Sequence, residues 1–312
     1  MENKEKNFAS AVIYVHNSED RIEAFLRTII EVMEDHFEHS EIVCVNDASD
    51  DRSLEMIKST SVLAHRTSVS VINMSYFHGI ELAMTAGVDL AIGDFVFEFD
   101  RTILDFEPEL IMNVYRRSLE GFDIVSAAPE RMERVSSKLF YGVFRHFAEI
   151  SGELSTESFR VLSRRVINRI SSMNKAVPYR KAVYANCGLK TDKIRYLSTQ
   201  RHAVGSDRKE ERYRTDLAID SLILFTNLGY EFSVRMTVLM MAISLFMVLY
   251  SIVVYATGNP VEGWTTTILF LSVAFLGLFG ILTIIVKYLQ LLVEMVFKRK
   301  HYSFESIEKL TK

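Results

Sequence analysis

The chain has 312 residues, enough for one large or two ordinary domains. Its formal net charge of −4 gives no global signal for nucleic-acid binding, so we expect no nucleic-acid partner. Cys44 and Cys187 show neither a CxxC nor a Cys/His spacing, which gives no support for a zinc site, and we expect both to be reduced packing residues.

Strand and helix patterns alternate through the first hundred residues. Residues 9–15 (ASAVIYV) predict a strand, and Ser18 is a cap candidate for a helix whose apolar stripe runs from Ile22 to Phe37. This alternation predicts an α/β fold with a doubly wound, mostly parallel sheet. The further strands are expected at 41–45, 69–74, 93–100 and 121–126, with helices starting near Leu54 and spanning 78–92.

Residues 93–100 (GDFVFEFD) predict a short apolar strand that ends in a carboxylate. Because side chains alternate along a strand, Glu98 and Asp100 are expected on one face. Buried acids are costly unless they are paired or hold a metal, and ligands of open α/β sheets bind at this end of the strands. A helix cap or a surface pair is the alternative.

Polar residues follow successive predicted strands, at Asn17 and Glu19, at Asn46 and Asp47, and at Asp100. The crevice at the carboxyl ends of such strands is where this class of sheet binds nucleotides. Neither GxGxxG nor GxxxxGK[ST] occurs, so the sequence supports neither a dinucleotide site nor a P-loop. We expect carboxylates to hold the base and ribose, with a metal on the phosphates.

Several segments together carry a resemblance to a known family. Residues 15–19 are similar to its first strand and Tyr-Asn-Glu turn, with His16 in place of the tyrosine, and residues 45–51 are similar to its Val-Asp-Asp-Gly-Ser-x-Asp signature. Residues 79–94, 108–111 and 159–165 are similar to its helix-and-strand run, the helix after its Asp-x-Asp motif, and its Phe-Arg-Leu-Leu-Ser-Arg segment. The chain thus resembles glycosyltransferase family 2, within it the polyprenyl-phosphate sugar transferases related to dolichol-phosphate mannose synthase.

The resemblance implies a GT-A-like domain that moves a sugar from a UDP- or GDP-sugar to a polyprenyl (undecaprenyl) phosphate for cell-surface glycan synthesis. It implies Mg²⁺ or Mn²⁺ as cofactor and a homo-oligomer as assembly. The alternatives are a transferase that extends a lipid-linked glycan and a catalytically inactive membrane-bound paralogue. The nucleotide-binding residues it implies are Asn17, Glu19, Asp47, Ser49 and Gly79.

The Asp-x-Asp motif departs from the family pattern. Asp100 matches its first acid, but Thr102 occupies the position of the second. Glu98 or Asp105 could supply the missing oxygen, since Mg²⁺ bound to a diphosphate needs one or two protein carboxylates. We favour Asp105, because a loop adapts to an ion more readily than a strand does.

Cations predict how the acceptor is held. Arg131, Arg134 and Lys138 lie on one face if their segment is helical, and the apolar residues that follow make it amphipathic; a solvated basic face is the alternative. A polyprenyl phosphate is already anionic and needs no general base, so Arg131, Arg134 and Arg160 are expected to position it beside Asp100. A hydroxyl acceptor would need a base, for which Glu157 is the candidate.

Residues 236–261 and 263–286 carry no charged side chain, and each run is long enough to cross a bilayer, with two buried core helices as the alternative. Arg235, Lys287 and Lys298 flank the runs, so the positive-inside rule places both flanks in the cytoplasm. The start lacks an apolar signal core. The sequence therefore predicts a multi-pass cell-membrane protein with the catalytic domain and both termini in the cytoplasm.

We expect four parts in the chain. Residues 180–214 contain ten Lys and Arg but four Asp and Glu. This basic segment is expected to lie within reach of anionic lipid head groups. An interfacial helix is expected to follow, with an ordinary core helix as the alternative. The parts are a catalytic domain (1–212), a juxtamembrane helix (213–233), two transmembrane helices (234–290, spanning about 236–257 and 264–286) and a cytoplasmic tail (291–312).

Overall fold

The computed structural model describes residues 4–130, 157–172, 180–198 and 302–311, together with scattered residues between 235 and 292. The chain divides into two compact units. The first comprises Met1–Arg145, Ile150–Ala218 and Arg299–Lys312, and it contains the sheet and the candidate site. The second comprises His146–Glu149 and Ile219–Lys298.

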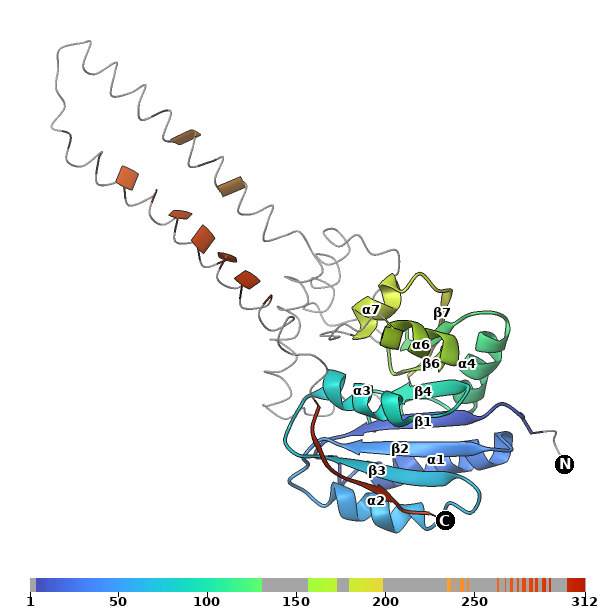
Figure 1. Cartoon of the computed structure of the whole chain (residues 1–312). Helices are drawn as coiled ribbons and strands as arrows, with labels where there is room; N and C mark the ends of the chain where they lie inside the picture. The colour runs from blue at the N-terminus through green and yellow to red at the C-terminus, as the bar shows by residue number, and fades with distance from the viewer. Residues whose placement is uncertain are drawn as a thin grey trace. The chain divides into compact units, whose positions relative to one another are not determined.

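Strands and helices alternate along the first unit, as the sequence predicts (Figure 1). The strands are β1 (Ala9–Val15), β2 (Ser40–Asn46), β3 (Ser68–Met74), β4 (Phe95–Phe99), β5 (Ile124–Pro129), β6 (Phe159–Ser163), β7 (Thr191–Tyr196) and β8 (Phe304–Lys309). The helices are α1 (Ile22–His36), α2 (Ser53–Ser61), α3 (Ile80–Leu90), α4 (Glu109–Leu119), α6 (Arg164–Ser172) and α7 (Arg180–Asn186).

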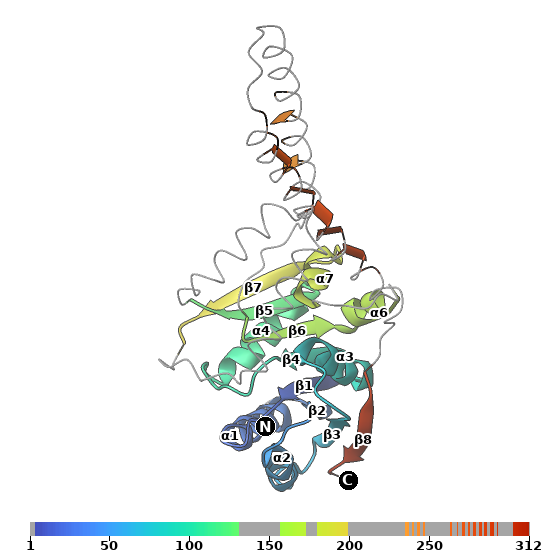
Figure 2. The same ribbon diagram turned by 90° about the vertical axis from the view of Figure 1, so that its left-hand side faces the viewer.

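The strands form one eight-stranded sheet in the order β7-β5-β6-β4-β1-β2-β3-β8 (Figure 2). β3, β2, β1 and β4 are parallel neighbours, and β5 is parallel to β7. β6 runs antiparallel between β4 and β5, and β8 runs antiparallel beside β3. The prediction of an α/β sheet is confirmed, and the sheet is mixed, with four parallel and three antiparallel pairings among the described strands.

Side-chain alternation produces two cores, one on each face of the sheet. One core gathers side chains from α1 and α4, and the other gathers side chains from α3, α6 and α7. On β4, Phe97 and Phe99 belong to the first core and Val96 to the second. Glu98, which alternates with the two phenylalanines, therefore faces the α3 side.

The end of the chain differs from the predicted tail. Residues 304–309 form β8, which pairs with β3 from Ser70 to Met74 as the edge strand of the catalytic-domain sheet. The chain thus leaves the sheet after β7 and returns to it in β8. The short alternating run ESIEK lacks the apolar content that marks a buried strand, so its sequence did not reveal this pairing.

The strand expected at 121–126 lies at 124–129, because Gly121 (φ 98°) makes a turn after α4.

The predicted juxtamembrane helix and most of both predicted membrane spans lie outside the described residues. In the part of the chain that the structure describes, no helix has the length and apolar character needed to cross a membrane.

Gly87 sets the distance between α3 and the sheet. A Cβ at this position would overlap Val12 and would lie 2.7 Å from Cγ2 of Val45. Alanine is normally better than glycine inside a helix by about 1 kcal/mol. Here we expect Gly87→Ala to lower the free energy of unfolding by about 1–3 kcal/mol in urea denaturation, because it overpacks the core. A stabilised variant would show that α3 is not held this close.

Candidate active site

The loops that follow β1 and β2 interlock through backbone hydrogen bonds. The Asn17 amide donates to Oγ of Ser49 (3.2 Å), and the Asp50 amide donates to Oδ1 of Asn17 (2.9 Å). Asn17 (φ 44°) and Ala48 (φ 49°) both adopt left-handed backbone, which tightens each turn. The two predicted nucleotide ligands Asn17 and Ser49 are therefore neighbours.

Glu19 extends the same contact toward α2. Its Oε2 accepts the Arg52 amide at 3.0 Å and the Arg52 Nε at 3.3 Å, and its own amide donates to Oδ2 of Asp51 (2.9 Å). One carboxylate oxygen of the half-buried Glu19 is thus bonded to the neighbouring loop.

Asp47 is fully buried and joins β2 to the loop before α3. Its carboxylate accepts the amides of His78 (2.8 Å) and Gly79 (2.8 Å) and the hydroxyl of Tyr14 (3.1 Å). Burial raises the pKa of Asp47, against the opposing effect of these hydrogen bonds. Asp47 is one of the expected nucleotide-binding residues, but its removal would leave two buried amides unpaired, so it also has a structural role.

The structure brings all five predicted nucleotide ligands together at the carboxyl ends of β1, β2 and β3. Gly79 (φ 80°) donates its amide to Asp47, so it belongs to the same network. Their binding to a nucleotide stays a prediction.

Arg160 binds both acids of β4. It is the register partner of Glu98 on the adjacent strand β6 and is almost completely buried. Its guanidinium donates to Glu98 Oε2 (2.9 Å), to Asp100 Oδ2 (2.8 Å) and, through Nε, to Glu157 (3.1 Å). The expectation that Glu98 and Asp100 share one face is confirmed.

A second buried arginine, Arg180 at the start of α7, binds the remaining oxygens. It donates to Glu98 Oε1 (2.8 Å), to Asp100 Oδ1 (2.7 Å) and, through Nε, to Glu81 on α3 (2.9 Å). The Tyr184 hydroxyl also donates to Glu98 Oε1 (2.8 Å). We call these seven residues the acid–arginine cluster: Glu81, Glu98, Asp100, Glu157, Arg160, Arg180 and Tyr184.

The charges of the acid–arginine cluster are mutually stabilised. Burial opposes ionisation of Asp100, but Arg160 and Arg180 hold its pKa well below the usual range. Burial likewise opposes the charge on both arginines, while the facing carboxylates raise their pKa values. Asp100, Arg160 and Arg180 are therefore charged at neutral pH, whereas burial raises the pKa of the Tyr184 phenol.

Asp105 does not join the acid–arginine cluster. Its Oδ1 accepts the hydroxyl of Tyr196 on β7 at 2.8 Å, and that hydroxyl also contacts Ser158 (2.5 Å). Thr102 is buried. The preference for Asp105 over Glu98 as the partner of Asp100 is not met by this arrangement, because β7 draws Asp105 into a separate hydrogen-bond network.

The predicted metal ligands Glu98, Asp100 and Asp105 do not fit a metal ion as they are arranged here. Each oxygen of Glu98 and Asp100 already accepts a hydrogen bond from a guanidinium. Among the described residues, no group of three or more His, Cys, Asp or Glu side chains is placed to hold an ion. A cation would first have to displace a buried arginine.

Arg160 binds carboxylates in this arrangement. It was expected to hold an acceptor phosphate, but four carboxylates face two guanidiniums in the acid–arginine cluster, and this excess of negative charge would repel a phosphate. Arg160 instead keeps the acids of β4 together. Arg131 and Arg134 lie outside the described residues.

Sequence reasoning missed the roles of Glu81, Arg180 and Tyr184. Arg180 was counted in the basic run from 180 to 214 and assigned to lipid heads, whereas it is 3% exposed. A signal existed for Arg160, a charge inside the apolar strand FRVLS. No comparable pattern pointed to Arg180, because its partners are 80 or more positions away along the chain.

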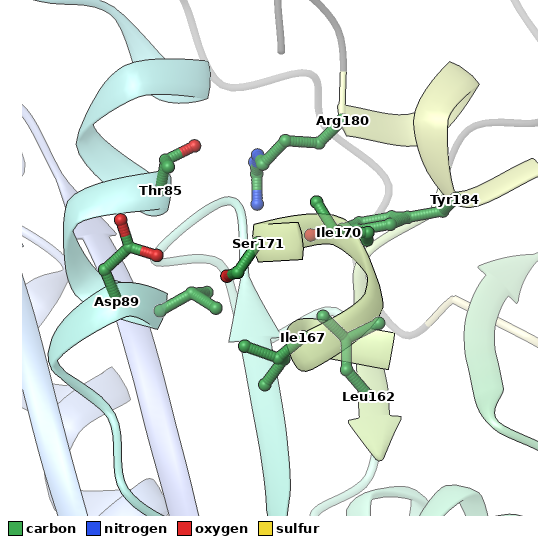
Figure 3. A pocket seen from close by; sticks show the side chains of 9 residues that line it. Thr85, Asp89, Leu162, Ile167, Ile170, Ser171, Arg180 and Tyr184 are labelled. Carbon is green, nitrogen blue, oxygen red and sulfur yellow. The ribbon is translucent and has the colours of Figure 1, made fainter. Parts of the chain in front are cut away.

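A small cavity lies beside the acid–arginine cluster, between α3, β6, α6 and α7 (Figure 3). Its volume is about 30 Å³, which admits water but not a sugar. Arg180 and Tyr184 line it together with Thr85, Asp89 and apolar residues. It is therefore not a substrate pocket in this arrangement.

We expect Asp100→Asn to lower the free energy of unfolding by about 3 kcal/mol at pH 7, because it breaks two buried ion pairs. The folded-state pKa lies below the unfolded value of about 3.9, so the unfolded chain takes up the proton first. The difference between wild type and variant should shrink as the pH falls below about 4. Urea denaturation against pH measures it, with Asp20→Asn at an exposed position as control; equal effects of the two variants would contradict a buried cluster.

We expect the protein without nucleotide to show no saturable Mn²⁺ binding that depends on Asp100, because the carboxylate oxygens are occupied by arginines. Calorimetry or electron paramagnetic resonance on wild type and Asp100→Asn measures this directly. A submillimolar dissociation constant that is lost in the variant would show that an ion displaces an arginine.

Comparison with known proteins agrees with this fold. Residues 10–101, which contain β1 to β4 and the loops of the site, match the model of Glycosyl transferase family 2. The chain is 26% identical over 268 residues to "Uncharacterized glycosyltransferase YkcC" of Bacillus subtilis, covering 83% of this chain and 81% of that one. It is 27% identical over 277 residues to "Bactoprenol glucosyl transferase" of Shigella phage SfV, covering 86% and 88%.

One solved structure shares the architecture at low identity. A mycobacterial protein superposes with a TM-score of 0.51 at 14% identity, covering 71% of this chain and 75% of its own. Glucosyl-3-phosphoglycerate synthase from Mycobacterium tuberculosis, crystallised with Mn²⁺ and UDP, superposes with a TM-score of 0.47 at 14% identity, covering 70% and 78%. The family model and the relatives, taken with the observed fold, identify this chain as a glycosyltransferase.

Proposed function

We propose that this glycosyltransferase moves a sugar from a UDP- or GDP-sugar to a polyprenyl phosphate such as undecaprenyl phosphate, for cell-surface glycan synthesis. The observation that carries the proposal is the similarity to bactoprenol glucosyl transferases along 86% of the chain, well beyond the donor-binding half. Bactoprenol is a polyprenyl alcohol, and its phosphate is the natural acceptor of such a transfer.

The donor nucleotide is proposed to lie over the interlocked loops after β1, β2 and β3. Backbone amides and the side chains of Asn17, Glu19 and Ser49 meet there. This is the end of a doubly wound sheet at which ligands bind. Asp47 and Gly79 support the site from beneath, since each is bonded within the protein.

The acceptor chemistry requires no general base. A phosphate monoester is already anionic at neutral pH, so its oxygen can attack the sugar carbon directly while the bond from that carbon to the nucleoside diphosphate breaks and the diphosphate leaves. A hydroxyl acceptor would need one, and the carboxylate of the candidate Glu157 is already paired with Arg160 at 3.1 Å. This pairing argues against extension of a lipid-linked glycan. Arg131 and Arg134 stay the proposed ligands of the acceptor phosphate.

A divalent ion, Mg²⁺ or Mn²⁺, stays the expected cofactor, although the acids predicted to hold it bind arginines in this arrangement. What the chain itself supplies at the end of β4 is a fixed set of charges. Arg160 and Arg180 prevent Glu98 and Asp100 from reorienting, so the floor of the donor crevice is rigid.

Anchorage in the cell membrane is part of the proposal. The two uncharged runs at 236–261 and 263–286 fall between β7 and β8, which belong to the same sheet. A segment that starts and ends in one compact unit must cross a bilayer an even number of times, which agrees with two spans and a cytoplasmic catalytic domain. A homo-oligomer remains the expected assembly.

The test is transfer by the full-length protein in detergent or nanodiscs. Labelled UDP- and GDP-sugars are offered with undecaprenyl phosphate, and with undecaprenol as the matched acceptor that lacks the phosphate. We expect label to enter the lipid fraction with undecaprenyl phosphate alone, as an acid-labile product.

Transfer to undecaprenol or to a lipid-linked glycan, with none to the phosphate, would overturn the proposed acceptor. Nucleotide binding without transfer to any acceptor would overturn the proposed reaction and would leave a membrane-bound binding protein.

A further inference from the structure

β8 reaches the loop that precedes α3. Beyond its ladder with β3, the Ser75 amide donates to the Ser303 carbonyl (3.0 Å), and the Ser303 amide donates to Nε2 of His78 (3.1 Å). Figure 1 and Figure 2 both show this last segment, coloured red, running beside β3. The segment that follows the second apolar run therefore contacts the donor side of the sheet directly.

The partners of His78 fix its ring completely. Ser303 presents an N–H, so Nε2 accepts, and Nδ1 must then donate to the Tyr76 carbonyl at 2.5 Å. The ring is buried and stacks on Tyr76 with 3.9 Å between ring centroids. The backbone amide of His78, with that of Gly79, holds the carboxylate of Asp47. Ser303 thus acts on Asp47 through one histidine.

A second, separate path leads from β8 to the β2 turn. Nδ2 of Asn73 donates to Ser306 Oγ (3.0 Å) and to Glu308 (3.3 Å), and its Oδ1 accepts from Asn46 (3.1 Å). Asn46 in turn accepts the Ser49 amide at 3.3 Å. The first path reaches Asp47 inside the turn from Asn46 to Ser49, and the second path reaches Asn46 and Ser49 at its two ends.

We propose that β8 is a positioning element for the nucleotide: Ser303, acting through His78, sets the two loops on which the donor lies. The proposal rests on the proposed function in so far as these loops bind the nucleotide. It makes donor affinity depend on residues that come after the second apolar run, more than 200 positions from the β2 turn. A strand that merely covers the edge of β3 would give no such dependence.

The test compares contacts at the two ends of β8. Ser303→Pro removes the amide N–H that donates to Nε2 of His78. His78→Phe keeps a ring that can stack on Tyr76 but removes the accepting nitrogen. Thr311→Val is the matched control, because it removes the hydroxyl oxygen that accepts the Val69 amide at 2.8 Å, at the opposite end of β3. Binding of UDP and GDP to the full-length protein is measured by calorimetry, alongside thermal unfolding.

We expect Ser303→Pro and His78→Phe each to weaken nucleotide binding about tenfold, the equivalent of one hydrogen bond, and the double variant to be no weaker than either. The nucleotide affinity of Thr311→Val should stay within about twofold of the wild-type value, even if this variant loses as much melting temperature as the other two. Amide exchange at residues 47–49 and 78–79 should rise in the first two variants but not in the control, with or without nucleotide.

Unchanged affinity in folded Ser303→Pro and His78→Phe, beside a wild type that binds nucleotide, would overturn the positioning role and leave the proposed function standing. Equal weakening by Thr311→Val would also overturn it, because the effect would then follow stability alone. A wild type that binds neither nucleotide overturns the proposed function, whereas the exchange data still report whether β8 orders the loops.

Discussion

The ion pairs between the acids of β4 and two buried arginines determine how this site is built. Buried carboxylates are costly unless they are paired, and Arg160 and Arg180 pair with both Glu98 and Asp100. Each arginine comes from a different element, one from the neighbouring strand and one from α7. The same contacts that stabilise the acids therefore attach α7 and, through Glu81, α3 to the centre of the sheet.

A different principle governs the loops on which the donor is proposed to lie. There the loops after β1, β2 and β3 are held by hydrogen bonds to each other, mostly between a backbone amide and a short polar side chain. Such contacts satisfy amides that the strand ends leave unpaired. They also keep Asn17 and Ser49 in fixed places before any ligand arrives, which lowers the entropy lost on binding.

Much of the fold could be predicted because it depends on local pattern. The alternation of apolar residues located β1 to β4 and their helices within about two residues, and the acids after each strand pointed to the crevice. Position in a strand also correctly placed Glu98 beside Asp100. What these acids bind could not be predicted, since a motif that resembles a metal site looks the same in sequence when arginines fill it.

The sequence by itself determined the class of sheet, the crevice and the faces of its strands, because side-chain period and strand-end polarity are properties of neighbouring residues. Only the tertiary structure decided the partners of Asp47, Glu98 and Asp100 and the place of β8. Arg180 and Ser303 reach their partners from 80 and 225 positions away. Contacts over such separations depend on how the strands are ordered in the sheet, which no local pattern encodes.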